Sequence, residues 1–288
     1  MDEIMTIKAN GLEFGYLSAG SPTGPLALLL HGFPDTPHTW RHLMPALAEA
    51  GYRVVAPYMR GYAPTSVPSD GAYQTGALAS DANALHEALG GGPDSVIIGH
   101  DWGAATTYGA TNAEPGRWRK AVTLALPPVS ALLSGFLTYD QLKRSFYIFV
   151  FQTPLAELAL NEQFLASLWR DWSPGHTEDL TPVFDAILRS PENTGAALGY
   201  YRAMLDTSRH QSAYAERQAA TETPGTVPTL YLHGADDGCL AADAIGLDAL
   251  PDHLPPGSRA DLVPRSGHFL QVERPAEVNA AILEWLAP

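Results

Sequence analysis

The chain has almost no cysteine, no long apolar segment and no basic run. Its single cysteine, Cys239, excludes intramolecular disulfides and metal sites built from cysteine pairs, and it suits a reducing compartment. Apolar runs such as 27–30 and 146–151 are far shorter than the roughly 20 residues needed to cross a bilayer. The first residues lack the basic flank and apolar stretch of a signal peptide, so we expect a cytoplasmic protein with no membrane partner.

Basic side chains are scarce. The sequence has 31 acidic against 17 basic residues, a net charge of −14 at pH 7, with no basic run suited to a phosphate backbone. Nucleic acid and anionic membranes are therefore unfavourable partners. With 45% apolar and 17% charged residues, the composition is that of a compact globular protein. A length of 288 residues predicts one large α/β domain with an insertion, or two domains.

Short apolar runs bounded by glycine and proline alternate along the chain with segments whose apolar residues recur at helical spacing. Five such runs predict strands, at 26–30, 53–56, 95–98, 121–124 and 229–232. Segments 40–50 and 77–89 have the pattern of crossover helices. The alternation predicts an α/β protein with a mostly parallel central sheet flanked by helices.

This alternation stops after the proline pair at 127–128 and resumes at about residue 226. In between, the sequence is rich in aromatic residues and leucine, in helix-like stretches such as 141–151 and 164–172. We therefore expect a core of residues 1–128 and 225–288, with a helical cap of residues 129–224 inserted into it.

A possible nucleophile follows the predicted strand at 95–98. The sequence Gly99-His100-Asp101-Trp102-Gly103 has the pattern of a nucleophile elbow, with aspartate where esterases have serine. Flanking glycines allow a sharp strand-to-helix turn, and the helix N-terminus favours a carboxylate by about 0.3–1 kcal/mol. An isolated pattern of this kind is often an ordinary turn. Because the chain contains no Gly-x-Ser-x-Gly sequence, a serine esterase is disfavoured.

The strand at 26–30 ends in His31-Gly32-Phe33-Pro34, a turn that presents backbone N–H groups. Together with the N–H of Trp102, the N–H of Phe33 is predicted to form an oxyanion hole, whose donors contribute about 2.7–4 kcal/mol each. His31 itself is interpreted as a structural residue held by hydrogen bonds.

An elbow of this type needs an acid and a histidine later in the chain, in that order. The predicted strand at 229–232 is followed by Asp236 and Asp237, and His268 lies near the C-terminus. No acidic residue directly follows the strand at 121–124. The residues therefore predict His268 as the base, with Asp236 or Asp237 as the acid.

These motifs resemble the epoxide hydrolase branch of the α/β-hydrolase family. The resemblance covers nearly the whole chain and rests on the segments 31–34, 60–62, 99–103, 234–237 and 267–275. It implies an α/β-hydrolase fold with no metal or organic cofactor. In this family the acid follows a glycine by three positions, which implies Asp237 rather than Asp236.

The resemblance also implies two tyrosines in the cap. One precedes a Phe-Gln element, which corresponds to Tyr147, and the other lies in a Tyr-Arg element, which corresponds to Tyr201. Tyr200 is the rival for the second position. This sequence departs from the family pattern at Ala63-Pro64, where family members usually have glycine and a variable residue. The departure affects the shape of the entrance to the site more than the chemistry.

The implied reaction is hydrolysis of an epoxide to a vicinal diol. Asp101 is already charged at neutral pH and attacks a ring carbon without a base, while the tyrosines assist the departing oxygen. His268, oriented by Asp237, then activates water to cleave the alkyl-enzyme ester. The expected substrate is a small hydrophobic epoxide, in an apolar pocket shaped by Phe136, Phe149, Leu155, Trp169 and Trp172.

Two other functions are compatible with parts of the sequence. A haloalkane dehalogenase shares the Asp-Trp elbow, but Phe33 stands where that family often has a second halide donor such as asparagine. A non-catalytic binding protein on the same fold would usually lack part of the triad, whereas Asp101, Asp237 and His268 are all present. The sequence leaves monomer and homodimer open.

Overall fold

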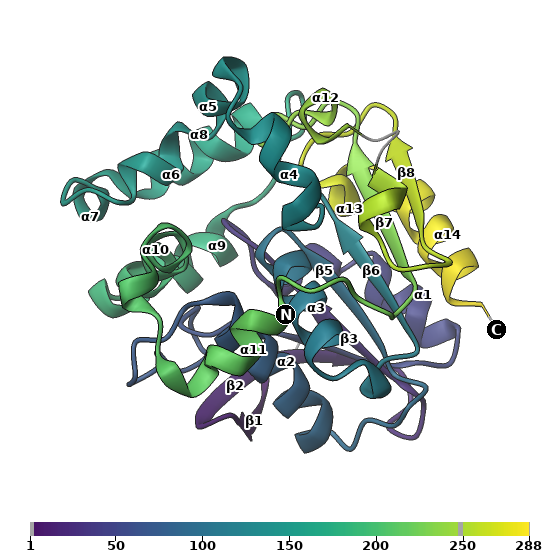
Figure 1. The fold of residues 1–288 in the computed structure, drawn as a ribbon. Coiled ribbons are helices and arrows are strands. Elements are labelled where there is room, and N and C mark those ends of the chain that lie inside the picture. Colours follow the sequence, from purple (N-terminus) through teal and green to yellow (C-terminus); the bar gives the residue numbers. More distant parts are fainter. Residues whose placement is uncertain (1–2, 247–249, 288) are drawn as a thin grey trace.

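The computed structural model describes residues 3–246 and 250–287. These residues form an eight-stranded sheet with the order β1-β2-β4-β3-β5-β6-β7-β8 (Figure 1). The strands are β1 (Met5–Ala9), β2 (Leu12–Ala19), β3 (Leu26–Leu30), β4 (Arg53–Pro57), β5 (Val96–His100), β6 (Lys120–Leu124), β7 (Thr229–Gly234) and β8 (Arg259–Val263). Strand β2 pairs antiparallel with β1 and with β4, and the remaining pairs are parallel.

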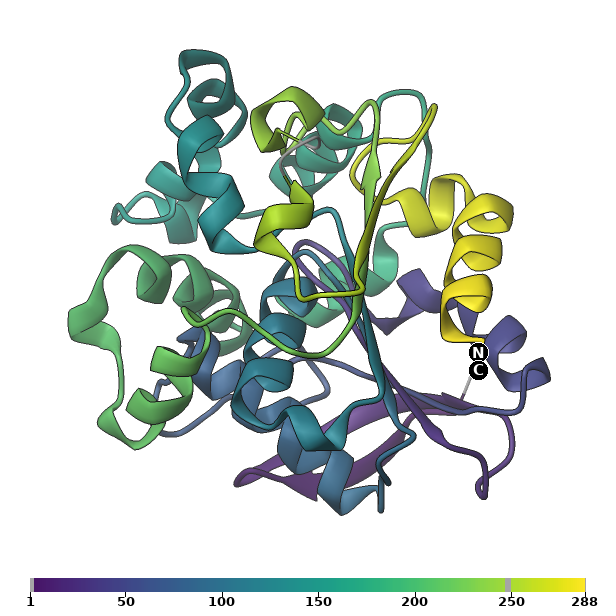
Figure 2. The same ribbon diagram turned by 45° about the vertical axis from the view of Figure 1, so that its right-hand side comes forward.

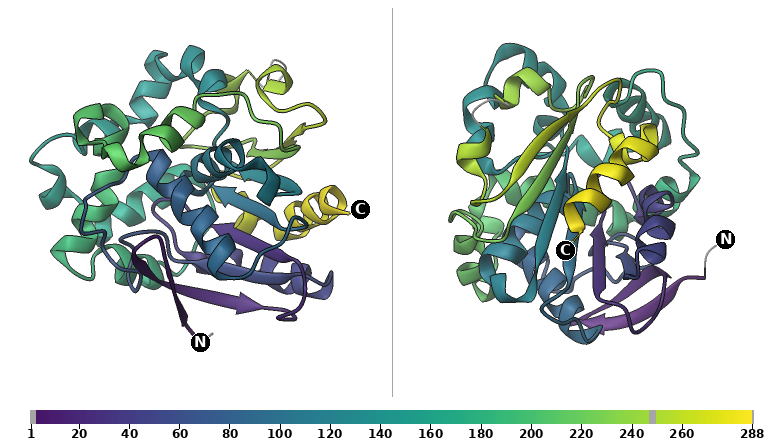
Figure 3. Two further views of the ribbon diagram at one scale, coloured as in Figure 1. Left: turned by 60° about the horizontal axis from the view of Figure 1, so that its bottom comes forward. Right: turned by 90° about the vertical axis from the view of Figure 1, so that its right-hand side faces the viewer.

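The mostly parallel sheet predicted from the sequence is confirmed. All five predicted strands are present, as β3 to β7, with ends within two residues of the prediction. The pattern missed β1, β2 and β8. Strand β1 is largely exposed and β8 is only partly buried; the two lie at the edges of the sheet, so they have no continuous apolar run (Figure 3).

Apolar side chains of the central strands pack on both faces of the sheet. In β3, Leu26, Leu28 and Leu30 pack into one cluster together with α2 (Thr75–Ala88), whereas Ala27 and Leu29 pack with residues of α1 (Leu43–Glu49) and α14 (Pro275–Leu286). Successive strand residues point to opposite faces, so a strand covered by helices on both sides is apolar throughout. Figure 2 shows α1 and α14 on one side of the strands and α2 and α3 (Trp102–Ala113) on the other.

A helical insertion separates β6 from β7, which are neighbours in the sheet. Its helices gather beside and above the sheet in Figure 1. They are α4 (Val129–Phe136), α5 (Tyr139–Arg144), α6 (Phe146–Val150), α7 (Ala156–Ala159), α8 (Glu162–Trp172), α9 (Thr181–Ile187), α10 (Pro191–Leu205) and α11 (Ala215–Ala220). The exact division into core and cap stays a prediction.

The helix-like stretch predicted at 141–151 is two helices rather than one. The break lies at Ser145, between α5 and α6, and the side chain of this buried residue accepts a hydrogen bond from Gln141 Nε2 at 2.9 Å. Serine competes with the helix backbone for local hydrogen bonds, which accounts for a break that apolar periodicity did not show. Across the described residues, no helix combines the length and the apolarity needed to span a bilayer.

A buried ion pair fastens the loop after β4 to α2. Arg60 Nε lies 2.6 Å from Asp81 Oδ2, and Arg60 Nη2 lies 2.7 Å from Asp81 Oδ1. The insertion contacts the same loop, because the hydroxyl of Tyr200 donates to the carbonyl of Arg60 at 2.8 Å. Arg60 is thus a structural anchor beneath the insertion.

We expect Asp81→Ala to lower the free energy of unfolding by about 3–5 kcal/mol, because it leaves the Arg60 guanidinium buried without its carboxylate. Urea denaturation of the variant and the wild type measures the difference. The matched control is Asp140→Ala, which removes the exposed Asp140–Lys143 pair and should cost no more than about 1 kcal/mol. A loss for Asp81→Ala as small as that of the control would contradict the prediction.

Candidate active site

Asp101 lies at the junction of β5 and α3 with a φ of 52°, a conformation that non-glycine residues seldom adopt. The flanking glycines make this turn possible through close approach. A Cβ on Gly99 would lie 2.1 Å from the carbonyl oxygen of Gly103, and one on Gly103 would lie 2.1 Å from that of Leu30. The elbow therefore presents the Asp101 side chain at the end of the strand.

The carboxylate of Asp101 receives a backbone hydrogen bond at one oxygen. The N–H of Phe33 donates to Oδ1 at 2.8 Å. Burial raises the pKa of Asp101, while the nearby His268 and hydrogen bonds from the N–H groups of Phe33 and Trp102 hold the increase down. Of the two N–H groups predicted from the sequence as oxyanion donors, that of Phe33 bonds the Asp101 carboxylate directly, and that of Trp102 contributes to lowering its pKa.

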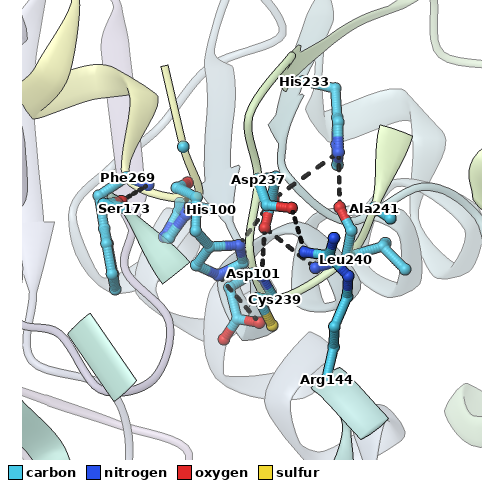
Figure 4. A network of polar contacts seen from close by, with 12 residues as sticks. His100, Asp101, Arg144, Ser173, His233, Asp237, Cys239, Leu240, Ala241 and Phe269 are labelled. Atoms are coloured by element: carbon cyan, nitrogen blue, oxygen red, sulfur yellow. Dashed lines mark hydrogen bonds and ion pairs between the residues drawn. The ribbon is translucent and has the colours of Figure 1, made fainter. Parts of the chain in front are cut away.

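His268 and Asp237 form the second part of the site. His268 Nδ1 lies 2.9 Å from Asp237 Oδ2, and its Nε2 lies 3.8 Å from Asp101 Oδ2. The N–H groups of Cys239 and Leu240 donate to Asp237 Oδ1 at 2.7 and 2.9 Å. Figure 4 shows Asp237 surrounded by these partners. His268 Nε2 is buried and has no hydrogen-bond partner within the described chain, and it lies on the side of Asp101.

The charges of this group follow from its contacts. Burial disfavours the charged form of Asp237, but the charge and hydrogen bond of His268 outweigh it and lower the pKa of Asp237. Burial likewise opposes protonation of His268, yet the charges of Asp237 and Asp101 raise its pKa above the ordinary value. Asp236, the rival acid, has an exposed side chain and is not part of this network.

Tyr147 on α6 and Tyr201 on α10 reach the elbow from the insertion. Their rings meet edge to face at 5.5 Å, and Tyr201 also contacts the rings of Phe33 at 5.2 Å and Trp102 at 5.3 Å. The Tyr201 hydroxyl is buried and makes no hydrogen bond to any described residue. The Tyr200 hydroxyl is instead bonded to the Arg60 carbonyl, so the geometry brings Tyr201, not Tyr200, to the elbow.

Both phenols are neutral at ordinary pH. Burial raises the pKa of Tyr201 well above 10, and the negative charge of Asp101 adds to the shift. Burial has the same effect on Tyr147, whose hydroxyl lies 3.5 Å from Cys239 Sγ. Each phenol can therefore donate a proton or a hydrogen bond toward an oxygen above Asp101.

Three polar residues of the site were missed in the sequence. His100 Nε2 lies 2.9 Å from the carbonyl oxygen of His268, and His100 Nδ1 lies 4.0 Å from Asp35 Oδ2. Burial raises the pKa of Asp35 to about 7. Cys239 was considered only for disulfides and metals. The sequence did contain one indication of these residues: each lies within two residues of a motif already singled out.

The predicted apolar pocket needs a correction. Phe149 and Leu155 are 45% and 64% exposed, so they do not line an enclosed site. Trp169 is buried, but it stacks on Phe269 and donates to the carbonyl of Pro34 at 2.7 Å. Trp172 does reach the site, with ring contacts to His268 at 5.1 Å and to Tyr147 at 5.0 Å. The error arose because an amphipathic helix pattern does not show which apolar side chains face the elbow.

His31, interpreted from the sequence as structural, makes two hydrogen bonds. The N–H of Met59 donates to its Nε2 at 3.0 Å, which leaves Nδ1–H to donate to the carbonyl of Gly32 at 2.8 Å. Burial lowers the pKa of His31 to about 3, so the ring is neutral. Within the described ranges, no group of three or more His, Cys, Asp or Glu side chains could hold a metal ion.

Comparison with known proteins agrees with the fold and the motifs. A family model described as the alpha/beta hydrolase fold matches residues 25–275. Epoxide hydrolase A of Mycobacterium tuberculosis is 30% identical, over 97% of this chain and 96% of that protein. The crystal structure of Epoxide Hydrolase A from Mycobacterium thermoresistibile has a TM-score of 0.80 at 27% identity, covering 99% of this chain and 98% of that one.

A haloalkane dehalogenase loop variant from Bradyrhizobium elkanii also has a TM-score of 0.80, covering 99% of this chain and 96% of that one. At 19% identity it shows a shared fold alone. The sheet, the elbow and the matching family model define the class: the chain belongs to the α/β-hydrolase-fold family. Within that family, its 30% identical relative places it in the epoxide hydrolase branch.

Proposed function

We propose that this chain is an epoxide hydrolase that converts a small hydrophobic epoxide to a vicinal diol. The observation that carries the proposal is the pair of buried phenols, Tyr147 and Tyr201, beside the Asp101 elbow. A carboxylate nucleophile suits a carbon whose leaving oxygen stays attached to the product, and weak acids suit that oxygen as it becomes an alkoxide. The relatives named epoxide hydrolases support the same reaction.

In the first step, Asp101 attacks a ring carbon. Its Oδ1 is bound to the N–H of Phe33, so Oδ2 is the oxygen free to form the ester bond. The ring C–O bond breaks as the ester C–O bond forms, and the released oxygen takes a proton from Tyr147 or Tyr201. Their high pKa values keep both phenols protonated until that oxygen becomes basic.

In the second step, water cleaves the ester. His268 takes a proton from water through Nε2, and the water oxygen adds to the carbonyl carbon of the Asp101 ester. The N–H group of Phe33, which bonds Asp101 Oδ1 in the free protein, and that of Trp102 hold the oxyanion. Collapse of this intermediate expels the alkoxide, which takes the proton held by His268 and becomes the diol. The carboxylic acid left at Asp101 passes its proton to the phenolate, so Asp101, His268 and the phenol return to their starting states. The chemistry needs no metal or organic cofactor.

The surroundings of Asp101 favour an apolar substrate. The aromatic rings of Phe33, Trp102, Trp172 and the two tyrosines contact one another beside the elbow. We assign residues 129–224 as a cap on a core of residues 1–128 and 225–288, because the cap supplies both phenols and the core supplies the triad. Substrate and water are the only partners that this reaction requires.

The test of the proposal is diol formation from styrene oxide, cyclohexene oxide and a long-chain terminal epoxide, alongside halide release from matched bromoalkanes. We expect diol without halide, and no diol above the uncatalysed rate from Asp101→Ala. Halide without diol would indicate a haloalkane dehalogenase instead. Neither product from wild-type protein would favour a binding protein on this fold.

The two phenols should control ring opening. Tyr147→Phe and Tyr201→Phe should each slow formation of the alkyl-enzyme ester by roughly 10-fold to 100-fold, because one proton donor to the leaving oxygen is lost. Rapid-quench measurement with intact-mass detection of the ester gives this rate. Tyr200→Phe is the control, since its hydroxyl bonds the Arg60 carbonyl and should affect stability by about 1 kcal/mol rather than ring opening. Equal effects at all three positions would contradict these roles.

The rate of ester hydrolysis should decline at low pH but not at high pH. His268 is a base only when neutral, and its pKa lies above the usual 6.5 because the charges of Asp237 and Asp101 outweigh burial. The rate should therefore fall roughly tenfold per pH unit below that pKa. Ring opening should not decline up to about pH 10, because the phenols stay protonated. Single-turnover rates against pH measure both limbs, and an alkaline decline of ring opening near neutral pH would be the opposite result.

A further inference from the structure

The loop that follows Asp237 is held by a helix of the insertion. Gln141 on α5 is only 2% exposed, and its Nε2 donates to the carbonyl of Cys239 at 2.8 Å and to Ser145 Oγ at 2.9 Å. Its Oε1 accepts from the N–H of Ala241 at 3.0 Å. One buried side-chain amide therefore binds a carbonyl and an N–H group of the loop 239–241. Gln141 lies 98 residues before Cys239 in the chain.

The same short loop orients the acid of the triad. The N–H groups of Cys239 and Leu240 donate to Asp237 Oδ1, which leaves Oδ2 for His268 Nδ1 at 2.9 Å. Arg144, on the same helix as Gln141, donates to the carbonyl of Asp237 at 3.2 Å. The helix thus fixes the peptide groups that fix the carboxylate, and the carboxylate fixes the imidazole.

We propose that Gln141 is a positioning residue for the hydrolytic step, acting through the 239–241 loop on Asp237 and His268. This inference rests on the proposed function. Hydrolysis of the ester depends on the direction of His268 Nε2, and a displacement of about 1 Å can cost up to 100-fold in rate. Formation of the ester does not depend on that direction, because the Asp101 carboxylate is held by backbone N–H groups from other loops.

Gln74 provides a matched control for the loss of the two backbone hydrogen bonds that Gln141 makes to residues 239–241. Gln74 is also 2% exposed, and it binds the backbone of Gln211 in the same two-sided way. Its Nε2 donates to the carbonyl of Gln211 at 2.9 Å, and its Oε1 accepts from the N–H of Gln211 at 2.8 Å. Replacing either glutamine by methionine keeps the length of the side chain and leaves one backbone N–H and one carbonyl without their partner.

Gln141 also bonds Ser145, which lies two residues before Tyr147, so this contact needs its own control. Ser145→Ala removes that hydrogen bond alone and keeps the grip on residues 239–241. If the clamp on the loop is what matters, Ser145→Ala hydrolyses its ester at the wild-type rate. Gln141→Glu provides a second variant at the position itself, because it keeps an acceptor for Ala241 and loses the donor to Cys239.

The experiment is a single-turnover reaction of wild type, Gln141→Met, Gln74→Met, Ser145→Ala and Gln141→Glu with styrene oxide and cyclohexene oxide. Rapid quench and intact mass follow the ester on Asp101, and diol release follows its hydrolysis. For Gln141→Met we expect ester formation within about twofold of wild type and hydrolysis slower by roughly 10-fold to 100-fold, so the ester accumulates. Gln141→Glu should also accumulate ester. If Gln141→Met does not fold, the same ester and diol measurements on Gln141→Glu test the proposal.

The melting temperature of Gln74→Met should be lowered by about as much as that of Gln141→Met, but Gln74→Met should not accumulate the ester. The proposal is wrong if ester hydrolysis in Gln141→Met matches that in Gln74→Met, or if ester formation and hydrolysis fall together. It is also wrong if Ser145→Ala reproduces the effect. Absence of both ester and diol in wild-type protein would instead refute the proposed function, so the two failures are distinguishable.

Discussion

The hydrogen bond from the Phe33 N–H to Asp101 Oδ1 is the contact on which the site depends. It is possible because residue 32 is glycine: a Cβ there would lie 2.4 Å from that oxygen. The loop after β3 and the elbow after β5 must therefore approach closely, which neighbouring parallel strands allow at their carboxyl ends. With Oδ1 held in this way, Oδ2 is the oxygen on the side of His268. The strained φ of Asp101 is held by the same packing.

The triad is not complete in the sheet alone, because the insertion joins the loops that carry the acid and the base. The carbonyl of Trp172, at the end of α8, accepts from the N–H of Gly238 and from that of His268, both at 3.0 Å. Ser173 Oγ then donates to Glu273 at 2.6 Å. An insertion that only covered the site would not need hydrogen bonds to the loops that hold Asp237 and His268. The insertion thus contributes directly to the positions of the loops that hold Asp237 and His268.

The sequence predicted those parts of the molecule that depend on local pattern. Strands buried on both faces, such as Leu26–Leu30, have apolar residues at every position, and the elbow has glycines at the two positions where a Cβ would collide. Edge strands such as Arg259–Val263 have no such pattern and were missed. The grip of Gln141 on residues 239–241 joins segments far apart in the chain, so no local pattern could reveal it. The exposure of Phe149 also depends on tertiary packing.

Burial raises or lowers every pKa in the site, but the partners of each group decide its charge. Asp237 has N–H donors on one oxygen and His268 on the other, so it stays ionised despite complete burial. Burial, together with the negative charge of Asp101, raises the pKa of Tyr201 well above its usual value, so this phenol stays neutral. Asp101 lies between these extremes, with one backbone donor at Oδ1 and the imidazole of His268 3.8 Å from Oδ2. The charge states proposed for these buried groups are therefore distinguished by the supply of hydrogen bonds and nearby charges, in surroundings of common low polarity.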